Sequence, residues 1–337
     1  MRDRLMAILL GLALAAPAVA AAAAPQDAGI TTAETVLVTG EQPGPGLWLV
    51  RSADGQRDLY ILGTLSPLPA RMQLQSARID AVVANAQEVL LAPQVRVDFK
   101  DTGFFKSLFL LPSLLGARKN PDGRRLEQVV SPQAYARWRA LKARYIGSDR
   151  GIEGWRPLFA AMELYERAIK RAGMDTRDQA KPVVAAAIER HHPNVTPVKV
   201  EILLENPRAL IKEFSRTSLD DVACFEKTMD RIEGDLGAMR SRANAWATGD
   251  TLALQELPFA DQYEACKAAV SEAGIGRRLG FGDAERRLQD KWMATAEGAL
   301  ARNRVTFATL PLREMLGPDG YLARLRARGY TVLAPDE

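Results

Sequence analysis

Few residues in this chain are suited to chemistry, and the histidines are the clearest case. The sequence has only two, His191 and His192, which stand side by side before Pro193. Neighbouring side chains point to opposite sides of a strand and lie about 100° apart on a helix. The pair is therefore poorly placed to chelate one metal ion, and we interpret it as an exposed helix end.

Ser66 is the second candidate, because it follows Gly63-Thr64-Leu65 where a predicted strand ends. A serine nucleophile needs a neighbouring base. The sequence has no histidine outside the adjacent pair to activate it, although a lysine or carboxylate partner remains open. A buried hydroxyl that bonds to nearby backbone is the favoured interpretation.

Cys224 and Cys266 are the only cysteines. Two cysteines in a secreted protein can pair, whereas their spacing excludes a CxxC redox centre. We predict a disulfide that joins a long helix over residues 220–248 to a helix after Pro258. In the chain-entropy model, closing a loop of this length contributes about 4 kcal/mol. Two free buried thiols are the alternative.

The elements that position these residues begin with a predicted β-hairpin. Residues 47–51 and 59–65 have strand character, and residues 53–56 form the turn, where Gly55 is free to take a positive φ. The apolar run 60–62 is typical of a strand buried on both faces. Further strands are predicted at 88–91, 198–204, 303–309 and 330–333.

Helical periodicity dominates the middle of the chain. Leu158, Met162, Tyr165 and Ile169 are predicted to face the core from one of these helices, and Gly329 suits the position after the last one. The apolar segment 104–115 is a helix or a hydrophobic loop. We predict an α/β (α+β) fold, in which strands from both chain ends build a mixed sheet around a large helical middle. The helices are expected over 76–87, from 131, from 155, over 178–190, from 207, over 220–248, over 283–302 and over 317–328.

The amino terminus has the pattern of a secretory signal peptide. A short basic start precedes the apolar run 5–16, and Ala18-Val19-Ala20 resembles a cleavage site. An uncleaved anchor is the alternative, but the run is short for a membrane span. We predict a signal peptide over 1–24, a linker over 25–45 and one domain over 46–337. The mature chain should be periplasmic or secreted, without a stable membrane span.

Charge gives no sign of a nucleic-acid partner. The formal net charge is +4, and removing Arg2, Asp3 and Arg4 leaves about +3. Short basic pairs are interspersed with acidic residues, as on solvated helix faces. No recognition motif for nucleic acid is present.

Several motifs together resemble the TraB/GumN family, which is related to the Tiki metalloproteases. The resemblance covers residues 46–337 and implies the α/β fold described above. GumN-type members are associated with exopolysaccharide gene clusters, which implies a role near envelope polysaccharide. The motif residues that carry the resemblance are Trp48, Gly63, Thr64, Trp246, Gly249, Asp250, Gly320, Gly329 and Tyr330, with Cys224 and Cys266 flanking the tryptophan segment.

The residues that the resemblance would place in the active centre are absent. Ser66 stands where the family has histidine after Gly-Thr, Ala92 where it has glutamate, and Pro311 where it has histidine in Gly-x-x-His. The following segment, 312–316, is longer than usual. A metal-assisted hydrolase needs imidazoles or carboxylates that converge on one ion. Serine is a weak ligand for transition metals, and proline offers none.

These replacements favour a non-catalytic relative that needs no cofactor and binds an unknown envelope ligand or protein. The alternative is an active hydrolase or peptidase with a rebuilt site, based on a carboxylate or on Ser66. That alternative predicts that Ser66 or a nearby carboxylate lies in a pocket with a strongly perturbed environment.

Overall fold

The computed structural model describes residues 44–99, 111–257 and 262–335. The expected signal peptide, most of the expected linker and residues 104–110 of the apolar segment lie outside these ranges. None of the helices in the described ranges combines the length and apolar character that a membrane crossing needs.

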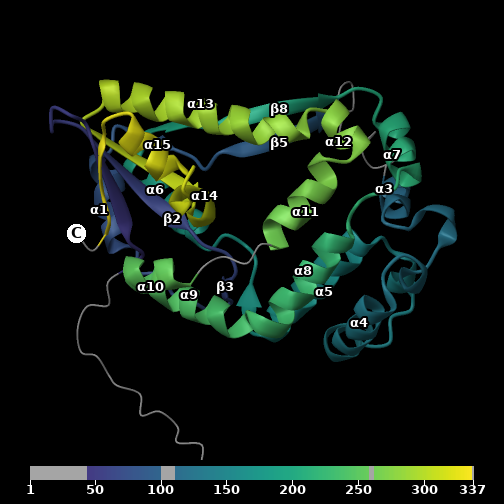
Figure 1. The fold of residues 1–337 in the computed structure, drawn as a ribbon. Coiled ribbons are helices and arrows are strands. Elements are labelled where there is room, and N and C mark those ends of the chain that lie inside the picture. Colours follow the sequence, from purple (N-terminus) through teal and green to yellow (C-terminus); the bar gives the residue numbers. More distant parts are fainter. Residues whose placement is uncertain (1–43, 100–110, 258–261, 336–337) are drawn as a thin grey trace, which may run out of the picture. The chain divides into compact units, whose positions relative to one another are not determined.

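A six-stranded mixed sheet forms the core of the described chain (Figure 1). Its order is β10-β1-β2-β9-β4-β7, and strands from both chain ends lie at its centre, as predicted. β10, β1 and β2 are antiparallel, whereas β2, β9, β4 and β7 are parallel. The strands are β1 (Leu47–Arg51), β2 (Asp58–Thr64), β4 (Glu88–Leu90), β7 (Asn194–Thr196), β9 (Val305–Pro311) and β10 (Thr331–Leu333).

The predicted hairpin is confirmed as β1 and β2. Leu49 pairs with Tyr60, and Gly55 takes a φ of 71° in the turn. Arg51 donates from Nε to Asp58 Oδ1 over 2.8 Å, which closes the hairpin beside its turn. Leu59, Ile61 and Leu62 are fully buried, in keeping with a strand covered on both faces.

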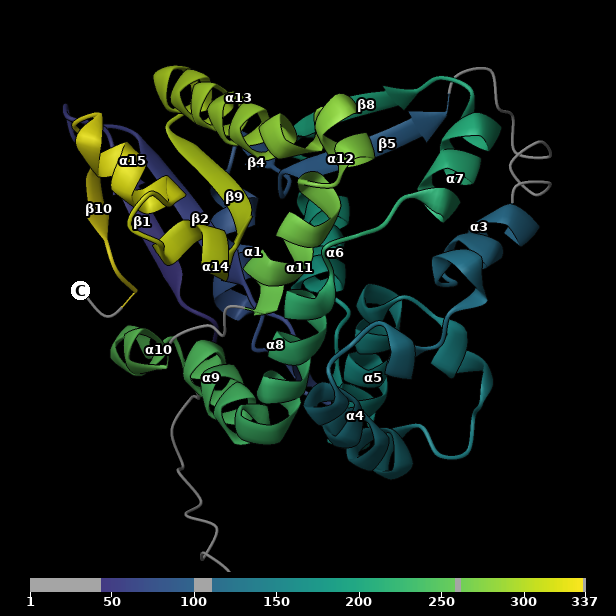
Figure 2. The ribbon, with the colours of Figure 1, turned by 45° about the vertical axis from the view of Figure 1, so that its right-hand side comes forward.

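Helices cover both faces of the sheet (Figure 2). α1 (Ala77–Asn85) and α6 (Ala180–His191) lie on one face, and α13 (Phe281–Arg302) and α15 (Tyr321–Ala327) on the other. This arrangement follows from right-handed crossovers, because the chain moves across the sheet in one direction through α1 and α6 and returns through α13 and α15. α15 ends at Ala327, and Gly329 has a φ of 87°, as predicted.

Two smaller sheets extend this core. β5 (Gln94–Phe99) and β8 (Lys199–Leu204) form a parallel pair that packs against α13. β3 (Leu68–Pro69) pairs with β6 (Met174–Asp175), which ties the chain beyond β2 to the helical middle.

The helical middle has its own core around Trp138 and Phe225, whose ring centroids are 5.4 Å apart. Ser131 caps its helix as expected, since its hydroxyl accepts the amide of Ala134 at 3.1 Å. The remaining helices are α3 (Leu111–Ala117), α4 (Pro132–Tyr145), α5 (Pro157–Arg171), α7 (Pro207–Arg216), α8 (Val222–Gly234), α9 (Leu236–Thr248), α10 (Thr251–Glu256), α11 (Gln262–Ser271), α12 (Gly274–Arg278) and α14 (Leu312–Leu316).

Two expectations about this middle region are wrong. The helix predicted over 220–248 is interrupted at Asp235, which separates α8 from α9. Gly234 and Gly237 flank the break and favour helix weakly, while the Asp235 carboxylate accepts a 2.7 Å hydrogen bond from Arg242. Met162, predicted to face the core, is 55% exposed.

Candidate functional site

Three of the retained motif residues, Trp48, Gly63 and Trp246, pack together at the carboxyl end of β2. The Trp246 indole N–H donates to the backbone oxygen of Gly63 over 2.5 Å, which joins α9 to the strand. A Cβ on Gly63 would lie 2.7 Å from Leu312 and 2.9 Å from Met315, so only glycine fits without movement. We call the residues Trp48, Gly63, Trp246, Leu312 and Met315 the sheet floor.

Other retained residues shape the backbone around this floor. Gly249 ends α9 with a φ of 71°, and Asp250 then caps α10 by accepting the amide of Ala253 at 2.9 Å. A Cβ on Gly320 would lie 2.6 Å from the backbone oxygen of Glu314. Each of these residues therefore has a local structural role.

A cleft of about 630 Å³ opens beyond the carboxyl ends of β2 and β9. Thr64 pairs with Pro311 in the sheet, and both residues line the cleft together with Ser66. Ligands of open α/β sheets bind at this edge. Two of the three positions singled out in the sequence, Ser66 and Pro311, therefore line the same cleft.

Two points remain, which are the position of Ala92 and the hydrogen bond of the Ser66 hydroxyl. Ala92 follows β4 and does not belong to the described lining of the cleft. Ser66 is exposed, and its hydroxyl donates to the backbone oxygen of Thr176 over 2.7 Å. The predicted hydrogen bond from the Ser66 hydroxyl to the backbone is confirmed. The predicted burial of Ser66 is wrong, because the residue is exposed at the cleft.

The residues at these positions do not fit the metal that the family resemblance implies. Ser66 offers one hydroxyl, Ala92 a methyl group and Pro311 a ring without a ligating atom. Within residues 44–99, 111–257 and 262–335, no group of three His, Cys, Asp or Glu side chains is placed to hold a metal ion. His191 ends α6, and its Nε2 instead lies 3.1 Å from Asp80 Oδ1.

Charged and aromatic side chains also line the cleft, and we call five of them the cleft wall: Tyr165, Arg231, Tyr263, Arg313 and Glu314. Arg231 is only 5% exposed, and its guanidinium carbon lies 5.2 Å from the centre of the Tyr165 ring. Its Nη1 donates to Gln262 over 2.7 Å. Burial raises the pKa of Tyr165, so this phenol stays protonated.

Arg313 belongs to the cleft wall and lies on α14, directly after Leu312 of the sheet floor. Its guanidinium carbon lies 4.9 Å from the centre of the Tyr263 ring. Burial and then the neighbouring charge of Arg231 lower the pKa of Arg313. Two cationic side chains from α8 and α14 are thus held near each other beside aromatic rings.

Glu314 is the one carboxyl that we assign to the cleft wall, and its pKa is strongly perturbed. It is half-buried and lines both the cleft and an adjoining cavity of about 650 Å³. Burial and then the charge of Glu285 raise its pKa to about 7. Lys267 is nearby but pairs with Glu264 and Glu285. Among the described residues, no hydrogen bond or ion pair joins the Glu314 carboxyl to a partner.

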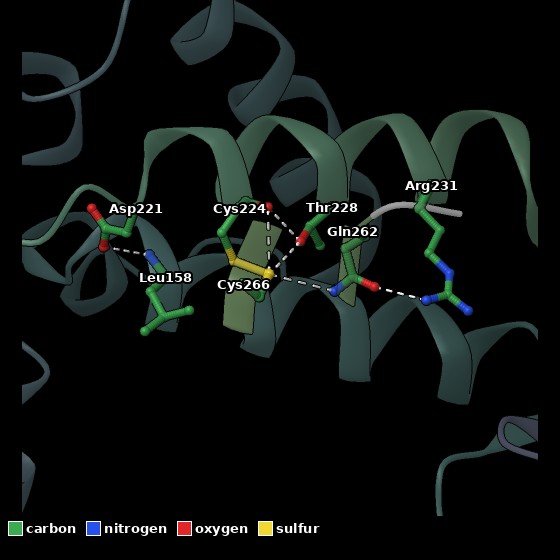
Figure 3. The surroundings of a disulfide bond; sticks show 7 residues. All are labelled: Leu158, Asp221, Cys224, Thr228, Arg231, Gln262 and Cys266. Atoms are coloured by element: carbon green, nitrogen blue, oxygen red, sulfur yellow. Dashed lines mark hydrogen bonds between the residues drawn. A yellow bond between two sulfur atoms is a disulfide. The ribbon is translucent and has the colours of Figure 1, made fainter. Parts of the chain in front are cut away.

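The predicted disulfide forms beside this wall (Figure 3). Cys224 on α8 bonds to Cys266 on α11, and Cys266 lines the cleft. Gln262, one turn before Cys266, accepts the hydrogen bond from Arg231. The disulfide therefore fixes the helix that positions Gln262 and Tyr263 against α8.

The sequence prediction missed the charged part of the cleft wall. Tyr165 was expected to be a core residue, and Arg231 and Arg313 had no recognisable motif. The one usable signal was the lengthened segment 312–316, because it inserts Arg313 and Glu314 directly after Pro311. Their meeting with Arg231 depends on how α8 and α14 pack, which no local pattern encodes.

Comparison with known proteins agrees with the motifs. The family model for the TraB/PrgY/gumN family matches residues 46–334. No curated protein and no solved structure matches the chain. The match spans most of the sequence and includes the sheet floor and the cleft, and the chain therefore belongs to the TraB/PrgY/gumN family.

Proposed function

We propose that this chain is an exported family member whose cleft binds an envelope ligand or partner protein without cleaving it. The observation that carries the proposal is the meeting of Ser66 and Pro311 at one cleft. These are the two positions where the family resemblance implies histidines. The cleft itself remains open, with a volume of about 630 Å³, which is in the range of small-molecule sites.

The proposed location rests on two features of the chain. The first 24 residues have the pattern of a secretory signal peptide. The Cys224–Cys266 disulfide is of a kind that persists in oxidising compartments such as the periplasm. The family association with exopolysaccharide suggests a saccharide as ligand, and a peptide is the other class that such a cleft accommodates.

The test pairs binding with product analysis. We expect the purified protein to bind at least one of three probes and to return it intact by mass spectrometry: acidic alginate oligosaccharides, neutral maltooligosaccharides or unfolded casein. Met162→Arg should weaken this binding about tenfold or more, because Met162 is 55% exposed and lines the cleft. Leu252→Arg is the matched control, since Leu252 is 69% exposed on α10.

Metal content provides the second arm of the test. We expect elemental analysis to find no stoichiometric metal, and Zn²⁺, Mn²⁺ and Co²⁺ to leave the unfolding temperature unchanged. Stoichiometric metal would overturn the proposal. So would cleavage of any probe that is lost when Ser66 or a cleft carboxylate is substituted.

A second candidate, a hydrolase with a rebuilt site, is favoured by Glu314. A carboxyl with a pKa of about 7 in a cavity can act as a general acid or base near neutral pH. This candidate predicts that Glu314→Gln abolishes cleavage of one probe, with a pH profile centred near 7. Recovery of every probe uncleaved, together with unchanged probe binding by Glu314→Gln, would reject the hydrolase candidate and leave the binding function.

A further inference from the structure

A second cationic site lies away from the cleft, where the ends of three helices meet. A cavity of about 390 Å³ is lined by Arg144 at the end of α4, Arg171 at the end of α5 and Arg240 on α9. No Asp or Glu among the described residues lines it. We call this site the arginine pocket.

Two hydrogen bonds build the pocket and fix its arginines. Arg171 donates from Nη1 to the backbone oxygen of Arg144 over 2.8 Å, and Arg240 donates from Nη2 to that of Ala172 over 2.6 Å. These bonds join α5 to α4 and α9 to α5. Each guanidinium carries five N–H donors, so one bond to a carbonyl leaves most of them available.

Capping explains only part of this arrangement. Cations near a helix C-terminus are favourable, which accounts for the bonds of Arg171 and Arg240. Arg144 lies in the last turn of α4 and gains from the same effect, but its side chain forms neither interhelical bond, and its guanidinium carbon lies 5.2 Å from the centre of the Tyr145 ring. All three side chains are exposed, and a bound polyanion would compensate charges that otherwise only water and salt screen.

The start of α9 contributes to the same pocket. Leu236 and Gly237, the first two residues of this 13-residue helix, also line the cavity. The preceding Asp235 provides no side-chain cap, because its carboxylate accepts from Arg242 instead. Asp235 also ends α8, so the negative end of that helix offsets the positive end of α9, and the three guanidinium groups supply the positive charge of the pocket.

We propose that the arginine pocket binds a phosphoryl group, carried by a phosphorylated small molecule or by a lipid headgroup. A phosphate monoester presents three oxygens and nearly two negative charges, which suits three planar guanidinium forks. A carboxylate has two oxygens and one charge and would leave about two of the three positive charges uncompensated, against about one for a phosphate monoester. The pocket is separate from the cleft, so this proposal does not depend on the function proposed above.

Calorimetry on the purified protein with inorganic phosphate and glycerol 3-phosphate tests the proposal. We expect saturable binding that Arg144→Gln weakens about tenfold, because one charge-assisted contact is lost. Arg144 makes neither interhelical bond through its side chain in the described structure, so this variant should fold. Arg139→Gln, with the same charge change on an exposed residue of α4, should alter binding by less than about twofold.

The source of the phosphoryl group is resolved by sedimentation with vesicles of phosphatidylcholine, with and without phosphatidic acid. Binding to glycerol 3-phosphate alone identifies a small molecule, whereas sedimentation only with phosphatidic acid identifies a lipid headgroup. Either result must be weakened by Arg144→Gln and not by Arg139→Gln. Equal loss in both variants, or no binding to any phosphoryl probe by the unchanged protein, would overturn the proposal.

Discussion

The sheet floor and the cleft wall are neighbours built on different principles. The floor around Gly63 and Trp246 is held by close packing and one buried hydrogen bond. The wall contains the ionisable side chains of Arg231, Arg313 and Glu314. Burial shifts the pKa of Arg313 and of Glu314 toward the uncharged form of each group. Retained motif residues thus contribute packing and a hydrogen bond to the fold, whereas partly buried ionisable groups line the cleft.

The difference lies in what each region contains, which is packing contacts in the floor and ionisable groups in the wall. A buried carboxyl without a partner destabilises a protein once it ionises. Perturbed pKa values cluster at functional sites, which makes Glu314 a candidate site residue. Changes in side-chain size should therefore destabilise the floor, whereas changes in side-chain charge should alter the wall.

The largest expected effect concerns the bond that holds the wall in place. Replacing both Cys224 and Cys266 by serine should lower the free energy of unfolding by about 4 kcal/mol, because the denatured chain regains the entropy of a loop with a sequence separation of 42. Urea unfolding of both forms measures the difference. A change below about 1 kcal/mol would mean that packing alone fixes α11 against α8.

Glu314 gives the next largest effect, and its sign is unusual for a carboxyl. Its pKa is about 7 in the folded protein and 4.5 as an unperturbed group. The folded state therefore binds the extra proton between these values, and stability falls as pH rises from about 4.5 to about 7. The slope is about 1.4 kcal/mol per pH unit, which gives at most about 3 kcal/mol.

Glu314→Gln should remove this pH dependence. The variant should match the unchanged protein near pH 4.5 and exceed its stability at pH 8, as followed by urea unfolding at several pH values. The groups that also act on this carboxyl are Glu264, Lys267 and Tyr263 on α11, Glu285 on α13, Arg313 on α14 and Tyr321 on α15. Glu189→Gln, an exposed change on α6, is the control, and identical pH curves for all three proteins would contradict the prediction.

The contrast between floor and wall also separates what the sequence could predict from what it could not. The hairpin, a strand near 303–309 and the disulfide follow from strand patterning and cysteine number, whereas the parallel pairing of β9 with β2 was not predicted. The break at Asp235 was missed because a helical period continues on both sides. Arg231 and Arg313 are 82 positions apart, and their approach depends on tertiary packing that periodicity does not record.

Gly63→Ala tests the floor with a smaller effect. Its methyl group would meet Leu312 at 2.7 Å and Met315 at 2.9 Å. Because both contacts are side-chain ends that can shift, we expect a loss of about 1–3 kcal/mol rather than failure to fold. Thermal unfolding measures this loss. Gly123→Ala, where an added Cβ meets nothing within 4 Å but φ is 68°, separates crowding from backbone strain.

Ser66→Ala gives the smallest expected effect and most directly compares the floor with the cleft above it. The change removes one hydrogen bond, from the hydroxyl to Thr176, at an exposed position only three residues beyond Gly63. We expect a loss of about 1 kcal/mol or less, because the freed carbonyl can bond to water. Probe binding should also stay within about twofold of the unchanged protein. If the variant strongly loses probe binding or probe cleavage while its stability is unchanged, Ser66 contributes directly to binding or catalysis. This variant therefore distinguishes a retained framework from a rebuilt active centre.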